Sequence, residues 1–312
     1  MNWTTKHIPS QSGRRVLITG GNSGIGFYTA LELARHGAEV ILPTRTTEKA
    51  NIVIERILSE VPRAKLTTQT LDLSSVDSIR SFVGFFAKYY PGQSLDLLIN
   101  NAGIMNLPKR EMTADGFERQ FCTNYLGPFI LTALLYPHMR QQAGTRIVTI
   151  SSKLVRSAKL DFSNLQSEKC YTAMYGTYAQ SKLANLVFML ELQRRLDTVR
   201  SPVMSVGAHP GLARTNLASN MSGFAQFLGA LLMPFIGQDA ASGALPTLYA
   251  ATSNEVIPAG YYGPDEFFEQ KGNPVKCKIP NSALEPGIAV RLWEISEMLT
   301  GVRFDLGGKS KH

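Results

Sequence analysis

Cysteine and histidine are scarce in this sequence and are not grouped. Its 312 residues include three cysteines, Cys122, Cys170 and Cys277, and five histidines. Neither residue type shows the short spacing that zinc sites use, so we predict no metal site. Three widely spaced cysteines also form no even disulfide framework, which predicts reduced thiols in a cytoplasmic protein.

Targeting segments and long apolar runs are also lacking. Residues 1–13 contain no apolar stretch of the kind that a signal peptide requires. The most apolar stretch, residues 223–237 (GFAQFLGALLMPFIG), contains Pro234 and is too short to span a bilayer. We therefore predict no transmembrane segment, while peripheral contact of this stretch with a membrane surface stays open.

Positive charge is in excess, but it is spread along the chain. The formal net charge is +8 and the pI about 9.4, yet no run of lysine and arginine is longer than two. A nucleic-acid interface usually gathers basic residues and interleaves them with aromatic ones, so we predict no nucleic-acid partner. The charge favours a solvated surface with some bias toward a phosphate-containing ligand.

Apolar residues are abundant and form alternating strand-like and helix-like segments. They make up 44% of the chain, with predicted strands at 16–18, 39–42, 66–71, 95–99, 146–150 and 202–207. Helical patterns lie between them at 24–36, 48–61, 76–89, 116–142 and 175–196. This alternation predicts an α/β fold with a doubly wound parallel sheet of Rossmann type in three α/β/α layers.

No internal repeat or linker divides the chain, so we expect a single domain over residues 1–312. Residues 1–13 would form a short N-terminal extension, and residues around 213–240 a substrate lid. The apolar part of that segment, 221–237, is equally compatible with a buried amphipathic helix.

A glycine-rich motif joins the first predicted strand to the first helix. It reads Thr19-Gly20-Gly21-Asn22-Ser23-Gly24-Ile25-Gly26. Glycine permits a tight turn and close approach of backbone to a pyrophosphate, and the helix N-terminus adds free N–H groups and a positive dipole end. Because a strand precedes the motif and a helix follows it, the motif indicates a dinucleotide site rather than a plain turn.

Arg45 follows the second predicted strand, where a dinucleotide site distinguishes its two nicotinamide cofactors. A carboxylate here usually binds the ribose 2′-hydroxyl of NAD, whereas arginine accommodates the 2′-phosphate of NADP. The chain has no acid in this loop before Glu48. Arg45 could be an ordinary exposed loop residue, but its forked donors favour NADP(H) over NAD(H).

Two further polar motifs follow predicted strands at the same edge of the sheet. Asp72 could accept a hydrogen bond from an adenine amino group or could be a turn residue. Asn100-Asn101-Ala102-Gly103 offers small residues where a cofactor passes close to backbone, although Asn and Gly are also common in turns.

Tyr178 and Lys182 lie four residues apart and share one face of a predicted helix. An ammonium beside a phenol favours the phenolate, so we expect Lys182 to lower the pKa of Tyr178 from its usual value of about 10. Such a tyrosine can act as an acid or base near neutral pH. Tyr175 is a rival, but it has alanine rather than lysine four residues later.

These motifs together resemble the short-chain dehydrogenase/reductase family over almost the whole chain. Within it the sequence is most similar to the retinol dehydrogenase-like branch and its bacterial relatives, through Ser181-Lys182-Leu183-Ala184-Asn185 and Leu292-Trp293-Glu294-Ile295-Ser296. The latter run is also similar to light-dependent protochlorophyllide reductase. However, the cysteine which that family uses near its tyrosine is absent, because Tyr178 follows Tyr175-Gly176-Thr177.

The resemblance implies a role for individual residues. Tyr178 would exchange a proton with the substrate, Lys182 would bind the nicotinamide ribose, and Ser152 would hydrogen-bond the substrate oxygen. Asn124 would anchor a water relay through a helix distortion. The adjacent Ser151 is an alternative to Ser152, because only one of two successive strand residues points inward. The remaining cofactor contacts implied by the resemblance are Asp72, Leu73, Asn100, Asn101, Ala102, Gly103, Pro210, Gly211, Leu212 and Thr215.

The resemblance therefore implies an NADP(H)-dependent oxidoreductase that acts on CH–OH donors and interconverts an alcohol and a carbonyl on a small apolar substrate. A retinoid, steroid, fatty aldehyde or isoprenoid would each fit. Two alternatives stay open: a protochlorophyllide reductase-like enzyme, and a catalytically silent nucleotide-binding regulatory protein. The set Asn124, Ser152, Tyr178 and Lys182 argues against the silent protein, which has no need of all four.

Overall fold

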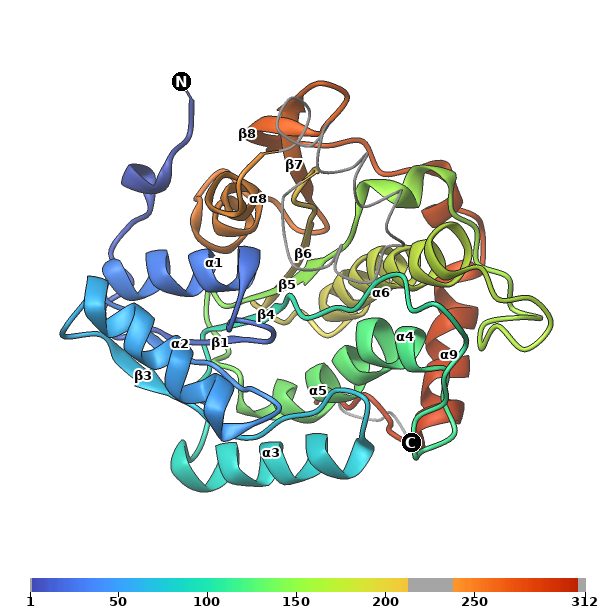
Figure 1. The fold of residues 1–312 in the computed structure, drawn as a ribbon, viewed down its shortest axis with the longest axis horizontal. Helices are drawn as coiled ribbons and strands as arrows, with labels where there is room; N and C mark the ends of the chain where they lie inside the picture. The colour runs from blue at the N-terminus through green and yellow to red at the C-terminus, as the bar shows by residue number, and fades with distance from the viewer. Residues whose placement is uncertain (1, 213–237, 308–312) are drawn as a thin grey trace.

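One eight-stranded sheet runs through the protein, of which the computed structural model describes residues 2–212 and 238–307 (Figure 1). Its strand order is β3-β2-β1-β4-β5-β6-β7-β8, with β1 to β7 parallel and β8 antiparallel to β7. The strands are β1 (Arg15–Ile18), β2 (Glu39–Ile41), β3 (Lys65–Thr67), β4 (Leu97–Asn100), β5 (Arg146–Ile150), β6 (Met204–Ala208), β7 (Tyr261–Glu266) and β8 (Lys271–Lys276). The chain order reverses between β1 and β4, which creates a crevice for ligands at the edge where the parallel strands end, the carboxyl edge.

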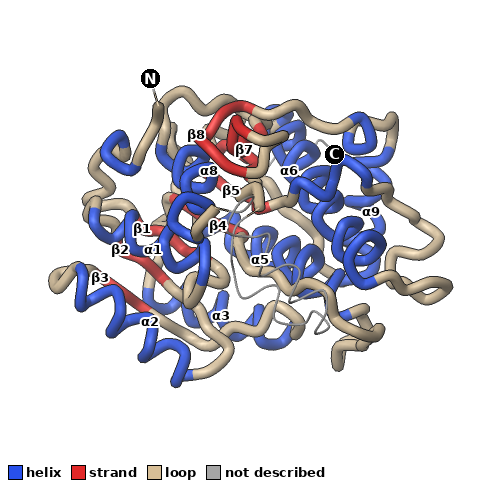
Figure 2. The backbone as a smooth tube through the Cα atoms, turned by 45° about the horizontal axis from the view of Figure 1, so that its top comes forward, coloured by secondary structure: helices blue, strands red, loops and turns tan. Residues whose placement is uncertain are grey.

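Helices cover both faces of this sheet, as the predicted fold class requires (Figure 2). They are α1 (Gly24–Arg35), α2 (Thr47–Glu60), α3 (Val76–Tyr89), α4 (Arg119–Phe121), α5 (Gly127–Leu135), α6 (Ala179–Thr198), α8 (Ala240–Thr252) and α9 (Ile288–Thr300). Because side chains alternate along a strand, Leu17 of β1 packs with α3, α5 and α6, whereas Val16 and Ile18 pack with α1, α2 and α8. The three-layer α/β/α prediction is confirmed.

The sheet contains two strands that were not predicted, β7 and β8, and these form a hairpin. Strands β7 and β8 escaped prediction because each contains glycine and proline, Pro264 in β7 and Pro274 in β8. Both residues are depleted in strands, and proline is tolerated at sheet edges, which is where this hairpin lies. The hairpin turn extends beyond the carboxyl edge of the sheet.

Two predicted elements also differ from those observed. Strand β3 is only three residues long, and the chain reaches Asp72 through a single further bridge between Thr44 and Thr70. The helix predicted over 116–142 is divided into α4, a π-helical segment (Cys122–Leu126), α5 and a 3-10 turn (Tyr136–His138). A π-helical turn contains one residue more than an α-helical turn, and the helical periodicity of a sequence does not reveal this.

The N-terminal extension packs against the body of the protein. Trp3 contacts the ring of Tyr249 in α8 edge-on, at 5.4 Å between ring centroids, and Ile8 is buried. The lid predicted around 213–240 lies mainly outside the described residues. In the described part of the chain, no helix has the length and apolar content needed to cross a membrane.

Candidate active site

The glycine-rich motif forms a tight loop between β1 and α1. Gly20 and Gly24 have φ angles of +67° and +54°, a conformation that residues with a Cβ adopt reluctantly. A Cβ on Gly26 would overlap the carbonyl oxygen of Gly20, so the helix can approach the loop only with glycine there. The N-terminus of α1 therefore opens onto a cradle of backbone, which fits a diphosphate.

A cavity of about 560 Å³ lies at the carboxyl edge, beside this loop. Most predicted cofactor residues line it, as do both members of the Tyr178–Lys182 pair. The predicted residues in the lining are Gly20, Asn22, Ser23, Gly24, Ile25, Gly26, Arg45, Asp72, Leu73, Asn101, Ala102, Gly103, Tyr178, Lys182 and Pro210. Tertiary structure thus gathers residues that are separated by up to 190 positions, at one edge of the sheet.

Other predicted residues do not line the cavity. Asn100 is buried, and its amide donates to Thr132 Oγ1 in α5 at 2.8 Å, so its side chain faces away from the crevice. Gly211 and Leu212 contact the β7–β8 hairpin instead, where Leu212 N–H donates to the carbonyl of Gln270 at 2.9 Å. Thr215 lies outside the described residues.

Arg45 lies at the exposed rim of the cavity, and a second cation joins it there. Lys49, one turn into α2, also lines the cavity and was not predicted. Its place in the first turn after Arg45 is the signal that could have revealed it. Glu48 is exposed and is absent from the lining, so this rim is cationic.

Asp72 has the turn role predicted for it, while its contact with adenine stays a prediction. It lines the cavity, and its Oδ1 accepts hydrogen bonds from the backbone N–H and the hydroxyl of Ser74, at 2.9 and 2.7 Å. It is therefore a turn residue whose position is locked beside the crevice.

Tyr178 and Lys182 are both buried, and burial dominates their pKa values. The Tyr178 side chain is 6% exposed, against 69% for the rival Tyr175. Burial raises the pKa of Tyr178 to about 12, although a side-chain hydrogen bond with Ser152 works the other way. Burial also lowers the pKa of Lys182 to about 8. The expected lowering of the tyrosine pKa by lysine is therefore wrong for this structure.

The geometry explains why lysine has so little influence. Lys182 Nζ lies 5.9 Å from the centroid of the Tyr178 ring and donates to the carbonyl of Ile150 at 3.0 Å. Desolvation of a phenolate in this site outweighs the attraction of an ammonium that is itself desolvated and engaged elsewhere. The phenol is consequently protonated at neutral pH.

The two adjacent serines after β5 have different partners. Ser151 is buried and donates to the backbone carbonyl of Lys182 at 2.7 Å. Ser152 is half-buried, and its side chain hydrogen-bonds that of Tyr178. Ser151 lines the cavity and Ser152 does not, whereas it is Ser152 that hydrogen-bonds Tyr178, so the choice of Ser152 as the partner of the reacting oxygen stays a prediction.

Asn124 lies in the π-helical segment Cys122–Leu126, so a helix distortion is present where the family resemblance implied one. Its amide bonds both backbone groups of Ile104, at 2.8 and 2.9 Å, and Ser181 Oγ at 2.9 Å. A Cβ on Gly103 would lie 3.3 Å from Asn124 Oδ1 and 3.2 Å from Lys182 Nζ. Asn124 thereby links the backbone that follows β4 to helix α6.

The chain is similar to proteins of known family. A family model described as short chain dehydrogenase matches residues 14–224. Retinol dehydrogenase 14 from Mus musculus is 36% identical over 307 residues, covering 93% of this chain and 86% of that protein. Retinol dehydrogenase 12 from Homo sapiens is 37% identical over 295 residues, covering 94% of this chain and 88% of that protein.

Solved structures agree with this similarity. An uncharacterized protein from Mycobacterium Paratuberculosis superposes with a TM-score of 0.81 at 36% identity, covering 98% of this chain and 100% of that chain. A short chain dehydrogenase from Burkholderia cenocepacia J2315, in complex with NADP, has a TM-score of 0.61 at 24% identity and covers 81% and 96%. The second likeness establishes the shared fold.

Proposed function

Because the chain belongs to the short-chain dehydrogenase family, in its retinol dehydrogenase-like branch, we propose that it interconverts an alcohol and a carbonyl on an apolar substrate with NADP(H). That it is an oxidoreductase follows from its family, which uses nicotinamide cofactors. The observation that carries the finer proposal is the cavity in which the buried Tyr178–Lys182 pair faces the glycine-rich cradle.

The cavity fits a nicotinamide dinucleotide by its chemistry. The N-terminus of α1 offers a positive dipole end and free N–H groups to a diphosphate, and glycine backbone permits close approach. Arg45 and Lys49 supply two cations where the second strand ends, which supports a 2′-phosphate and hence NADP(H). The bound cofactor would supply or accept the hydride.

Protein residues would donate the proton and stabilise the negative charge that develops on the substrate oxygen. Tyr178 would donate its proton to the developing alkoxide during carbonyl reduction, and its raised pKa keeps that proton in place until then. Ser152 would hydrogen-bond the same oxygen and stabilise its charge in a site shielded from water. Lys182 would bind the nicotinamide ribose.

An apolar substrate is supported by the residues near Tyr178 and by the relatives. Ile104, Met105 and Ile150 line the same cavity. Relatives that are 36–37% identical are named retinol dehydrogenases, and retinol is a long apolar alcohol.

The test is NADPH consumption with a panel of aldehydes and ketones of increasing chain length, for wild type and Tyr178→Phe. We expect turnover by wild type and at least a tenfold loss in the variant, about 1.4 kcal/mol of transition-state stabilisation. The affinity for NADPH should be retained, because the substitution removes only the hydroxyl.

Tyr175→Phe is the matched control and should leave turnover unchanged, because that side chain is exposed. NADPH binding without turnover of any carbonyl would instead support the silent nucleotide-binding protein. Full turnover by Tyr178→Phe would refute the assigned proton donor.

A further inference from the structure

The segment that follows β6 is tied to the β7–β8 hairpin. Leu212 N–H donates to the carbonyl of Gln270 at 2.9 Å. Gly211 has a φ of +65°, and a Cβ there would overlap the same carbonyl oxygen. Pro210, the preceding residue, lines the cavity together with Tyr178 and Lys182. The hairpin turn therefore bears directly on a wall of the candidate active site.

The hairpin turn has an unusual backbone conformation. Phe267, Phe268 and Glu269 have φ angles of 47°, 56° and 64°, so three consecutive residues with a Cβ are left-handed. Such residues enter this region at a free-energy cost, so other contacts must hold them there. The turn leaves Phe268 89% exposed and brings the Glu269 side chain back over the protein.

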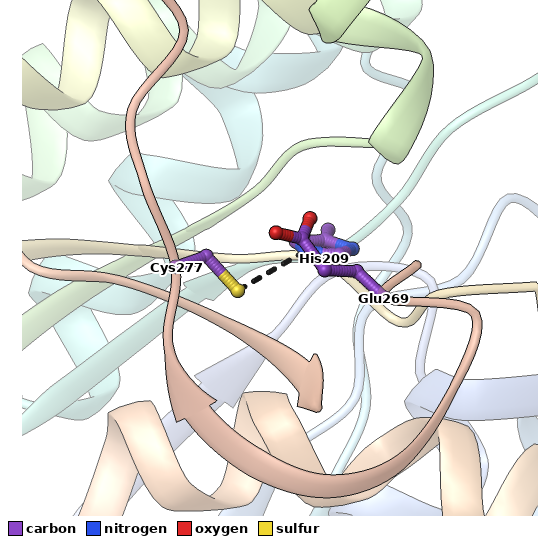
Figure 3. Close-up of side chains that lie close together, drawn as sticks. All are labelled: His209, Glu269 and Cys277. Carbon is purple, nitrogen blue, oxygen red and sulfur yellow. Dashed lines mark hydrogen bonds and ion pairs between the residues drawn. The ribbon is translucent and has the colours of Figure 1, made fainter. Parts of the chain in front are cut away.

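Glu269 meets a buried histidine, as Figure 3 shows. His209 Nε2 lies 3.4 Å from Glu269 Oε2, and the Gly211 N–H donates to His209 Nδ1 at 3.3 Å. Because Nδ1 accepts, Nε2 carries the proton of the neutral ring, and its neighbours are the Glu269 carboxylate and Cys277 Sγ, which lies 3.6 Å from Nε2. Burial lowers the pKa of His209, which keeps the ring neutral.

Arg156 completes the contact on the other side of Glu269. It forms an ion pair with the carboxylate, and its Nε lies 3.2 Å from Oε2. Partial burial works to raise the pKa of Glu269, but hydrogen bonds from His209 and Arg156 lower it to about 2. The carboxylate is therefore ionised, and it links η4 (Lys153–Ser157), the hairpin turn and the segment after β6.

Cys277 also approaches this group, which raises the question of a metal site. One ligand atom each from His209, Glu269 and Cys277 lie within 4.8 Å of one another. However, Nε2 carries a proton, and metal-bound histidines usually donate from the other nitrogen, where His209 accepts. We therefore interpret the group as a hydrogen-bonded cluster in which Arg156 binds Glu269, rather than as a metal site.

We propose that His209 and Glu269 are positioning residues that act through Gly211 and Leu212 to hold Pro210 in place as a wall against the nicotinamide half of the cofactor. The proposal rests on the proposed function in one respect, because it assumes that the cavity binds a nicotinamide dinucleotide. Gly263 is part of the device: a Cβ there would overlap His209 Nε2, so glycine in β7 makes room for the imidazole.

The test compares two ligands that differ in the nicotinamide half. Adenosine 2′,5′-bisphosphate lacks that half, so its affinity reports only on the adenosine side of the site. We expect His209→Asn and Glu269→Gln each to weaken NADPH binding at least tenfold by calorimetry, and to change bisphosphate binding less than twofold. His209→Gln should retain more NADPH affinity than His209→Asn, because its amide N–H can still reach Glu269.

Glu266→Gln is the matched control, with the same loss of charge on an exposed residue of the same hairpin. It should leave both affinities unchanged. Equal loss of both ligands in His209→Asn and Glu269→Gln would overturn the proposal in favour of a general folding defect. Equal NADPH affinity in Glu269→Gln and Glu266→Gln would overturn it as well.

A second measurement needs no nucleotide. Hydrogen exchange of the Gly211 and Leu212 amides should be at least tenfold faster in Glu269→Gln than in Glu266→Gln. If wild type fails to bind NADPH, the proposed function fails while this result still decides the positioning claim. Stoichiometric zinc bound by wild type and lost in Cys277→Ala would establish a metal site and overturn our account.

Discussion

Burial, rather than the neighbouring ammonium, sets the protonation state of Tyr178. Its pKa is raised to about 12, and that of Lys182 is lowered to about 8. A protonated phenol suits the donation step of carbonyl reduction without any further change. The reverse reaction needs a base, so it requires added positive charge near the phenol, which an oxidised nicotinamide would supply.

We expect single residues to determine the choice between NADPH and NADH, and Arg45 offers the test. Arg45→Asp should lower kcat/KM for NADPH by ten- to a hundredfold, because a charged hydrogen bond of about 1.5–3 kcal/mol is lost and a carboxylate repels the 2′-phosphate. The same carboxylate should improve use of NADH. The ratio of kcat/KM for the two cofactors is the measurement.

Two controls sharpen this prediction. Arg63→Asp makes the same charge change on an exposed residue outside the cavity lining and should leave the ratio unchanged. Lys49→Ala should lower the NADPH preference in the direction of Arg45→Asp. A ratio unaffected by Arg45→Asp would show that the arginine does not read the phosphate.

At the scale of elements, two π-helical segments position catalytic candidates. Cys122–Leu126 carries Asn124, and Ala173–Tyr178 ends at Tyr178. The first lies between the short helix α4 and α5, and the second leads directly into α6, so in both the wider turn sets the direction of the side chains that follow. The local arrangement of the site therefore depends on departures from ideal helices.

The approach of α1 to the glycine-rich loop leads to a prediction at Gly26. Gly26→Ala places a methyl group onto the Gly20 carbonyl oxygen and within 2.5 Å of Asn101 Nδ2, so loop or helix must shift. We expect at least a tenfold weaker affinity for NADPH and a lower melting temperature, measured by calorimetry and thermal unfolding.

Gly84→Ala is the control for Gly26→Ala. Gly84 lies within α3, and a Cβ there meets no atom within 4 Å. Replacing glycine by alanine in a helix should stabilise the protein by about 0.5–1 kcal/mol and leave cofactor affinity unchanged. Similar behaviour of the two variants would contradict the close-packing argument.

At the scale of the whole molecule, the C-terminal helix closes the core on the side of α6, as Figure 1 shows. Trp293 of α9 stacks on Phe188 at 5.8 Å between ring centroids, and it meets Phe129 edge-on at 5.4 Å. Arg195 lies over its indole ring, 4.2 Å from the centroid. This aromatic cluster joins segments more than 160 residues apart.

Removing the centre of the cluster should destabilise the protein without affecting its chemistry. Trp293→Ala should reduce the free energy of unfolding by about 3–5 kcal/mol, because a fully buried ring leaves a cavity. Denaturant titration measures the loss. Met298→Ala, on the same helix but 72% exposed, should change stability by less than about 0.5 kcal/mol.

Catalytic function distinguishes this loss from damage to the site. Trp293→Ala should retain wild-type kcat below its lowered melting temperature, since the ring does not line the cavity. A large loss of kcat in folded protein would show that α9 influences the active site.

The sequence alone determined the fold class and most residues of the cavity. Hydrophobic runs of strand length, each followed by a polar or glycine motif, specify strands and the edge at which they end. Local chemistry was enough for the glycine-rich loop, Arg45 and the Tyr178–Lys182 pair, because spacing along one strand–helix unit or one helix dictates their geometry.

Tertiary structure decided the properties that depend on distant atoms. Burial of Tyr178 and Lys182 reversed the expected change in the tyrosine pKa, because desolvation depends on everything packed around a group. Asn100 turned away from the crevice to Thr132, and Lys49 joined its rim. Glu269 and His209 are 60 residues apart in the sequence, and only the fold brings them together. The hairpin that carries Glu269 contains glycine and proline and lacks the alternation of apolar and polar residues by which a strand is recognised in a sequence.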